Sequence, residues 1–176
     1  MIEIIPNWHP IFVHFTVGLL ATATALFLLA AALPAGSSLQ RQAYLVAHWN
    51  LWLGYGFALA TALFGWLAFN SVAHDAPSHA AMTEHRNWAL ATLALYLPVV
   101  AWSIARHRAG KKAHALFLVA LAALTLMLAS TAWHGAELVY RHGLGVLSLP
   151  AVEARESAPH GQDAHSHTES GEHSHN

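Results

Sequence analysis

Four long apolar segments limit what this chain can fold into more than any other feature of its sequence. They cover residues 11–33, 51–73, 88–105 and 115–140. An α-helix rises about 1.5 Å per residue, so about 20 apolar residues are enough to cross the hydrocarbon core of a bilayer. The sequence therefore predicts an all-α fold, an integral membrane four-helix bundle formed by residues 1–150.

The overall composition supports a membrane protein and excludes several kinds of site. Hydrophobic residues make up 56% of the 176 residues and charged residues only 10%, whereas soluble domains carry about 25% charged residues. The chain has no cysteine, which excludes disulfides, thiolate zinc sites and covalent haem attachment. The net charge of -1 argues against a nucleic-acid partner. The sequence shows no convincing internal repeat.

The last part of the chain, residues 151–176, differs sharply in composition from the rest. It is rich in Glu, Ser, Gly and His and cannot bury a core, so we expect a disordered tail. Its histidines, which include two His-x-His pairs, form a predicted binding segment for copper or zinc. These are His160, His165, His167, His173 and His175. The alternative is an irregular tail that only increases solubility.

The distribution of charge predicts how the bundle is oriented. The first and third connections hold five of the eight basic residues and no acidic residue, while all nine acidic residues lie on the other side. Short connections rich in Lys and Arg stay on the cytoplasmic side of a membrane. We therefore expect both termini on the external side.

Most histidines outside the tail fall on the predicted external side, and two of them lie deepest. These are His14, within the first apolar segment, and His134, near the end of the fourth. His74 closes the second predicted helix and His85 opens the third, so each helix presents an imidazole at about the same level. Polar side chains at such depth usually face the bundle interior. Helical spacing predicts one inward stripe on each segment. The stripes are His14, Gly18, Ala21, Thr22 and Ala25; Gly54, Ala58, Thr61, Ala62 and Gly65; His85, Ala89, Thr92 and Tyr96; and Ala123, Met127, Ser130 and His134.

Inward imidazoles from separate helices, without nearby carboxylates or thiolates, suit the iron of a b-type haem. Zinc would need three or four close ligands. The predicted ligands are two of His9, His14, His85, His134 and His142. A second haem near His48, His107 and His114 is a weaker option. The alternative is that these histidines are ordinary residues of the membrane interface.

These sites predict a membrane b-type cytochrome that transfers electrons between the quinone pool and an external redox partner. Such a protein is an electron carrier rather than an enzyme, and the sequence contains no Ser/His/Asp order, HExxH motif or phosphate loop. Two other functions stay open. The chain could be a membrane protein that binds or handles copper or zinc, or a structural subunit of a respiratory complex without a cofactor.

Two segments resemble a known family. Residues 8–15, WHPIFVHF, resemble the HPxxVHF opening of the DUF2231 family of bacterial four-helix membrane proteins, and residues 135–146 resemble its closing GGxLVYxHGxGV segment. Residues 83–88 fall where the family has a histidine before its third helix. The resemblance implies a location in the bacterial inner membrane, in contact with lipid, and a haem site.

The chain departs from the family pattern at two positions. Ala136 replaces a glycine, and Trp133 stands where the family has a histidine, one position before His134. If the family resemblance counts for more than the depth of each histidine in the bilayer, a smaller set of haem ligands without His134 is preferred. That set is His9, His14, His85 and His142.

Overall fold

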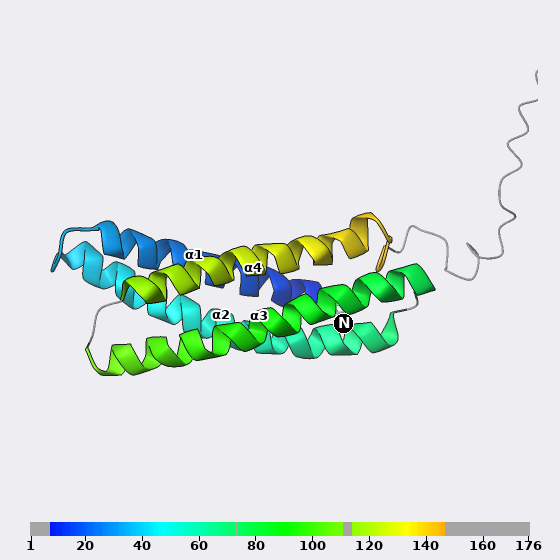
Figure 1. Cartoon of the computed structure of the whole chain (residues 1–176), viewed down its shortest axis with the longest axis horizontal. Coiled ribbons are helices and arrows are strands. Elements are labelled where there is room, and N and C mark those ends of the chain that lie inside the picture. Colours follow the sequence, from blue (N-terminus) through cyan, green and yellow to red (C-terminus); the bar gives the residue numbers. More distant parts are fainter. Residues whose placement is uncertain (1–7, 73, 111–113, 147–176) are drawn as a thin grey trace, which may run out of the picture.

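The computed structural model describes residues 8–72, 74–110 and 114–146, and these residues form four helices (Figure 1). The helices are α1 (His9–Ala32), α2 (Ser38–Ser71), α3 (Ala76–Arg108) and α4 (Ala115–Tyr140). All four are long and apolar enough to cross a membrane, and the described residues include no strand. The predicted membrane four-helix bundle is confirmed. The tail of residues 151–176 lies outside the described residues.

Helices α2 and α3 are longer than the apolar segments that predict them. Each begins at a polar residue that caps the helix, because a side-chain oxygen can accept a hydrogen bond from one of the first unpaired N–H groups. Ser37 accepts from the N–H of Gln40 at 3.1 Å, and Asp75 accepts from the N–H of Ser78 at 2.9 Å. The added turns carry polar side chains, so an apolar pattern alone does not reveal them.

The four helices form a ring in which each packs against its neighbours in sequence and α4 closes against α1. In Figure 1, α1 and α4 lie above α2 and α3, and successive helices run in opposite directions. Short connections between helices favour this antiparallel order. The end of the bundle where α1 and α3 begin and α2 and α4 finish is called the His9 end below.

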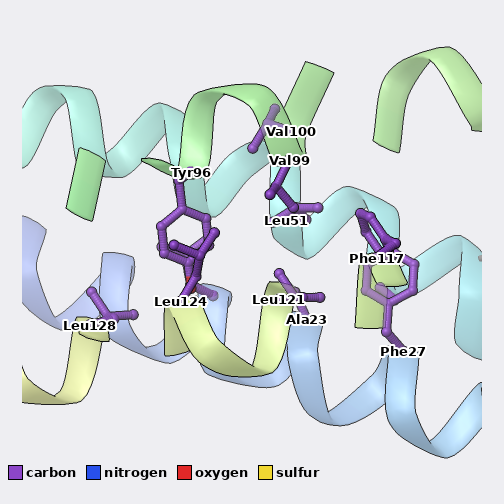
Figure 2. Packing of buried hydrophobic residues seen from close by; sticks show 12 residues of the cluster. Ala23, Phe27, Leu51, Tyr96, Val99, Val100, Phe117, Leu121, Leu124 and Leu128 are labelled. Carbon is purple, nitrogen blue, oxygen red and sulfur yellow. The ribbon is translucent and has the colours of Figure 1, made fainter. Parts of the chain in front are cut away.

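Most of the buried hydrophobic core lies in the half of the bundle away from the His9 end. Phe27 and Phe117 are almost fully buried, and their rings meet edge to face at 5.0 Å between centroids. Figure 2 shows them beside Ala23 and Leu121, with Tyr96 and Leu128 nearer the His9 end. Aromatic pairs favour this edge-to-face geometry.

The inward faces of α1 and α4 differ from the predicted stripes. His14, Gly18, Ala21, Thr22 and Ala25 are all exposed on the bundle's outer face, so the predicted stripe of α1 is wrong. The buried residues of α1 are Thr16, Leu20, Ala23, Thr24, Phe27 and Ala30. The buried residues of α4 are Phe117, Leu121, Leu124, Leu128 and Thr131. Both helices are apolar on all sides, so hydrophobic periodicity cannot show which face is buried.

Candidate functional site

A cavity of about 280 Å³ lies among the four helices at the His9 end. Every helix contributes to its walls, and most of the lining side chains are apolar. The stripe predicted for α2 is confirmed in part, because Ala58, Thr61, Ala62 and Gly65 all line the cavity. Two imidazoles also line it, those of His9 and His85.

His9 and His85 come from helices on opposite sides of the ring. His9 is the first residue of α1. The sequence predicts His85 at the start of the third helix, but His85 lies in the third turn of α3. Both side chains are partly buried. Their ring centroids are 6.4 Å apart, and the ring planes are nearly perpendicular, at 80°. The two imidazoles therefore approach each other across the bundle interior.

Each of the two rings is held by the backbone of the next helix. The Nδ1 atom of His9 lies 3.0 Å from the carbonyl oxygen of Thr61, and Nδ1 of His85 lies 3.1 Å from that of Thr131. A carbonyl oxygen can only accept, so Nδ1 is the donor in both contacts. In a neutral imidazole this leaves the lone pair on Nε2, which is the arrangement found in many histidine ligands of metals.

A glycine lies against each ring. A Cβ atom at Gly65 would be 2.9 Å from Cε1 of His9, and one at Gly135 would be 3.0 Å from Cε1 of His85. Both distances are shorter than the 3.5–4.0 Å at which carbon atoms pack favourably. Only glycine at these two positions lets the rings lie as close to α2 and α4 as they do.

Two threonine pairs lie one or two turns deeper in the cavity. The hydroxyl groups of Thr16 and Thr61 are 2.8 Å apart, as are those of Thr92 and Thr131. Thr61 also donates to the carbonyl oxygen of Phe57. These hydrogen bonds connect α1 to α2 and α3 to α4 beside the two imidazoles.

The site is built twice from the same parts. On α1 and on α3, a histidine is followed seven residues later by a threonine that bonds the next helix. On α2 and on α4, a threonine carbonyl oxygen accepts a hydrogen bond from the histidine ring, and the glycine four residues later lies against the same ring. The hairpins α1–α2 and α3–α4 are therefore two structural repeats running in the same direction, which the sequence alone did not reveal.

The charge inside the cavity is positive. Arg86 is the one residue with a formal charge among the described residues that line it. Its guanidinium group lies 4.9 Å from the centre of the Phe69 ring, and its Nη2 atom is 3.5 Å from Oδ1 of Asn87. A cation over an aromatic face is stabilised by the ring, and it can still attract an anionic group of a ligand.

Comparison with protein families matches residues 6–148 to a family described as "predicted membrane protein (DUF2231)". The chain belongs to the DUF2231 family. Comparison with curated proteins and with solved structures gave no match. The matched region of this DUF2231 protein contains both imidazoles, both threonine pairs and both glycines.

Three other predicted haem ligands do not line the cavity. His14 is exposed on the outer face of α1, and its Nδ1 donates to the carbonyl oxygen of Pro10 at 2.6 Å, so the prediction that it points inward is wrong. His134 stacks on Trp88, with 5.3 Å between centroids, and its Nε2 lies 3.6 Å from Oε1 of Glu84. His142 lies in the turn after α4.

A second group of histidines lies at the opposite end of the DUF2231 bundle. His48 and His107 have ring centroids 4.7 Å apart, and both rings pack edge to face on Trp52. The Nδ1 atom of His114 accepts from the N–H of Leu116 and so caps α4 instead of joining the pair. The structure thus brings together two of the three histidines of the predicted second site.

The predicted metal-binding histidines of the tail cannot be placed, because they lie outside the described residues. These are His160, His165, His167, His173 and His175. Within residues 8–72, 74–110 and 114–146, no three His, Asp or Glu side chains come together as a metal site. A zinc centre of the usual four-ligand type therefore has no counterpart in the described part of this DUF2231 protein.

Proposed function

We propose that this DUF2231 protein is a membrane b-type cytochrome in which His9 and His85 would hold one haem. It carries electrons between the quinone pool and an external redox partner. The observation that supports this most directly is the separation and position of the two imidazoles. They approach from opposite helices inside a cavity with apolar walls.

The separation of the rings fits two ligands on opposite sides of one metal. A metal–imidazole bond is about 2.0–2.1 Å long, and the centre of an imidazole ring lies about 1.1 Å beyond the bonded nitrogen, so two opposed rings have centroids about 6.3 Å apart. The centroids of His9 and His85 are 6.4 Å apart. Two imidazoles on adjacent corners of a tetrahedral ion would be only about 5 Å apart.

The backbone contacts of the two rings support the same role. Thr61 and Thr131 accept from the Nδ1 atoms through their carbonyl oxygens, which fixes the ring orientation and leaves Nε2 as the ligand atom. Because these oxygens belong to helices, they cannot rotate away as a side chain could. Gly65 and Gly135 hold each ring against the same helix.

The walls of the cavity suit a haem, which has an apolar body and anionic groups at its edge. Leu20, Tyr96 and Leu128 line the cavity and belong to the hydrophobic core, so they keep water from the deeper side of the imidazole pair. Arg86 at the same cavity would offset the negative charge of a bound haem's carboxylate groups. Bound haem would supply a one-electron redox couple, and its potential depends on its ligands and on burial.

The size of the cavity adds a requirement to this proposal. Ligand pockets usually measure about 300–1,000 Å³, and this cavity, at about 280 Å³, is slightly smaller. Lining side chains must therefore move outward when the macrocycle enters. Haem binding should also stabilise the folded protein, because a ligand that binds only the folded state raises its free energy of unfolding.

A spectrum of the purified protein, made with ample haem supply, tests the ligand assignment. We expect a reduced-minus-oxidised difference spectrum of a b-type cytochrome in the wild type, and its loss or conversion to a five-coordinate form in His9→Ala and in His85→Ala. His14→Ala is the matched control, since it removes an exposed imidazole from the same helix as His9. An unchanged spectrum in both cavity variants would refute the assignment.

Reduction by a quinol tests the electron-transfer part separately. We expect a soluble quinol to reduce the haem of the wild-type protein. A loaded protein that no quinol reduces would overturn the proposed route while leaving the ligand assignment intact. Metal binding by the tail stays a prediction, which removing residues 151–176 would test without affecting the haem spectrum.

A further inference from the structure

The cavity that holds the two imidazoles reaches the outer surface of the bundle between α2 and α3. Trp66 on α2 and Leu90 on α3 both line the cavity, although they are 58% and 50% exposed. They lie within the apolar segments 51–73 and 88–105, where a side chain on the outside of a membrane helix meets lipid rather than water. The opening beside these two residues is called the α2–α3 window below.

Two contacts between α2 and α3 bound the window. Nearer the His9 end, the guanidinium group of Arg86 lies over the ring of Phe69, 4.9 Å from its centre. Deeper in the bundle, the hydroxyl group of Tyr55 donates to the carbonyl oxygen of Leu93 at 3.3 Å. Hydrogen bonds between oxygen atoms are usually about 2.7–2.8 Å long, so this one is weak. The hydroxyl group of Tyr55 can therefore turn to another acceptor.

The space between these contacts suits a flat ring. Leu93 follows Arg86 by seven residues, so the two contacts lie about 10 Å apart along α3. Between them, Ala62 of α2 and Ala89 of α3 line the cavity with small side chains. A planar group that stands parallel to the helices can therefore pass between them from the lipid side.

The repeated structure provides a reference for the window, because the seam between α4 and α1 is its counterpart. Gly65 corresponds to Gly135 and His85 to His9, and the same offsets relate the other positions. Every aromatic or charged residue of the window has an uncharged, non-aromatic counterpart. The pairs are Trp66 and Ala136, Phe69 and Val139, Tyr55 and Thr125, and Arg86 and Pro10. Repetition of the scaffold therefore does not account for the rings and the charge of the α2–α3 window.

We propose that the α2–α3 window binds the ring of a quinone dissolved in the bilayer. Trp66 supplies an aromatic surface on which a flat ring can stack. The hydroxyl group of Tyr55 turns from the carbonyl oxygen of Leu93 to a carbonyl oxygen of the quinone, while the apolar tail of the quinone stays among the lipid. This inference rests on the proposed function, because it places the quinone of that function in the cavity that His85 also lines.

Photolabelling tests the site in the purified full chain, embedded in nanodiscs of phosphatidylcholine. The probe is an azidoquinone with a short alkyl tail, and labelled peptides are identified by mass spectrometry. We expect the label within residues 55–69 and 86–93, and we expect excess decylubiquinone to remove it. Excess oleic acid should leave it in place, because an acyl chain makes no hydrogen bond with Tyr55. Equal competition by both compounds, or label confined to other parts of the chain, would overturn the proposal.

Two variants with matched controls test the residues of the window, with the affinity for decylubiquinone measured by competition. Trp66→Ala makes the window resemble its counterpart and should weaken binding about 2- to 10-fold, whereas Trp133→Ala removes an exposed tryptophan that does not line the cavity and should have no effect. Tyr55→Phe should also weaken binding about 2- to 10-fold, and Tyr44→Phe, on the same helix but outside the cavity, is its control. Wild-type affinity in both Trp66→Ala and Tyr55→Phe would refute the site.

The same preparation separates this inference from the proposed function, because labelling is counted without any haem signal. A protein labelled in the window that gives no haem spectrum would refute the haem assignment and keep the quinone site. A haem-loaded protein that takes no label in the window would refute the quinone site alone.

Discussion

The contact between Gly65 and His9 leads to a prediction whose size can be worked out from the structure. In Gly65→Ala the new Cβ would lie 2.9 Å from Cε1 and 3.0 Å from Nδ1 of His9. To reach an ordinary contact of about 3.5–4.0 Å, the ring must move by roughly 0.6–1.1 Å. Such a movement would stretch the 3.0 Å hydrogen bond to the carbonyl oxygen of Thr61 and change the 6.4 Å separation from His85.

A matched substitution on the same helix isolates this effect. A Cβ at Gly56 meets no atom within 4 Å. Both substitutions gain helix propensity of about 0.8–1 kcal/mol, whereas only Gly65→Ala adds a steric cost, typically about 1–3 kcal/mol. We therefore expect Gly56→Ala to be slightly more stable than the wild type and Gly65→Ala to be about 1–3 kcal/mol less stable than Gly56→Ala.

Two measurements check this prediction. Thermal unfolding in detergent compares the stabilities, and haem titration compares the affinities. If the whole steric cost of about 1–3 kcal/mol is lost from haem binding, the affinity for haem falls roughly 5- to 150-fold. Gly65→Ala and Gly56→Ala that unfold alike and bind haem alike would show that the close approach of His9 to α2 is not needed.

Three further predictions test other parts of the structure. Phe27→Ala should lower the free energy of unfolding by about 3–5 kcal/mol because it opens a cavity in the core, whereas Leu28→Ala on the exposed side of α1 should change it by less than about 1 kcal/mol in the same thermal assay. Thr131→Val should lower the free energy of unfolding by about 1 kcal/mol, since it removes the 2.8 Å hydrogen bond to the hydroxyl of Thr92. The haem spectrum should stay unchanged, because the carbonyl oxygen that accepts from His85 is kept. Hydrogen bonds from Ser78, first from its side chain and then from its backbone, hold the pKa of Asp75 below 3.8, so the stability that this cap contributes is present above that pH and is lost as pH falls through the lowered pKa. Acid unfolding of Asp75→Asn should lack this contribution, and identical acid profiles for the variant and the wild type would contradict the role of the cap.

The membrane bundle was predictable because its main cause is visible in the sequence. Long uncharged segments leave few alternatives in a bilayer, where the backbone must satisfy its own hydrogen bonds. Helix rotation was predictable only where polar residues mark one side. Thr92 and Tyr96 mark the inward face of α3, and both are buried. On α1 apolar residues surround the helix, and the exposed His14 misled the prediction because its Nδ1 bonds its own helix.

The doubled site was present in the sequence but could not be recognised there. The equivalent pairs His9 and His85, and Thr16 and Thr92, share residue types, but the positions between them do not. Deeper on the same two faces, Phe27 corresponds to Ser103, because helix packing needs matching total volume rather than matching residues. The backbone carbonyl oxygens that accept hydrogen bonds from the two imidazoles cannot be recognised from the sequence at all.

Titration of haem into the purified protein, with iron counted per chain, tests the central claim most directly. The wild-type protein should take up one haem per chain as a six-coordinate, low-spin form, and His85→Gly should recover that form when free imidazole is added to replace the missing ligand. A wild-type protein that binds no haem, or a His9→Ala, His85→Ala double variant that binds it as the wild type does, would contradict the claim.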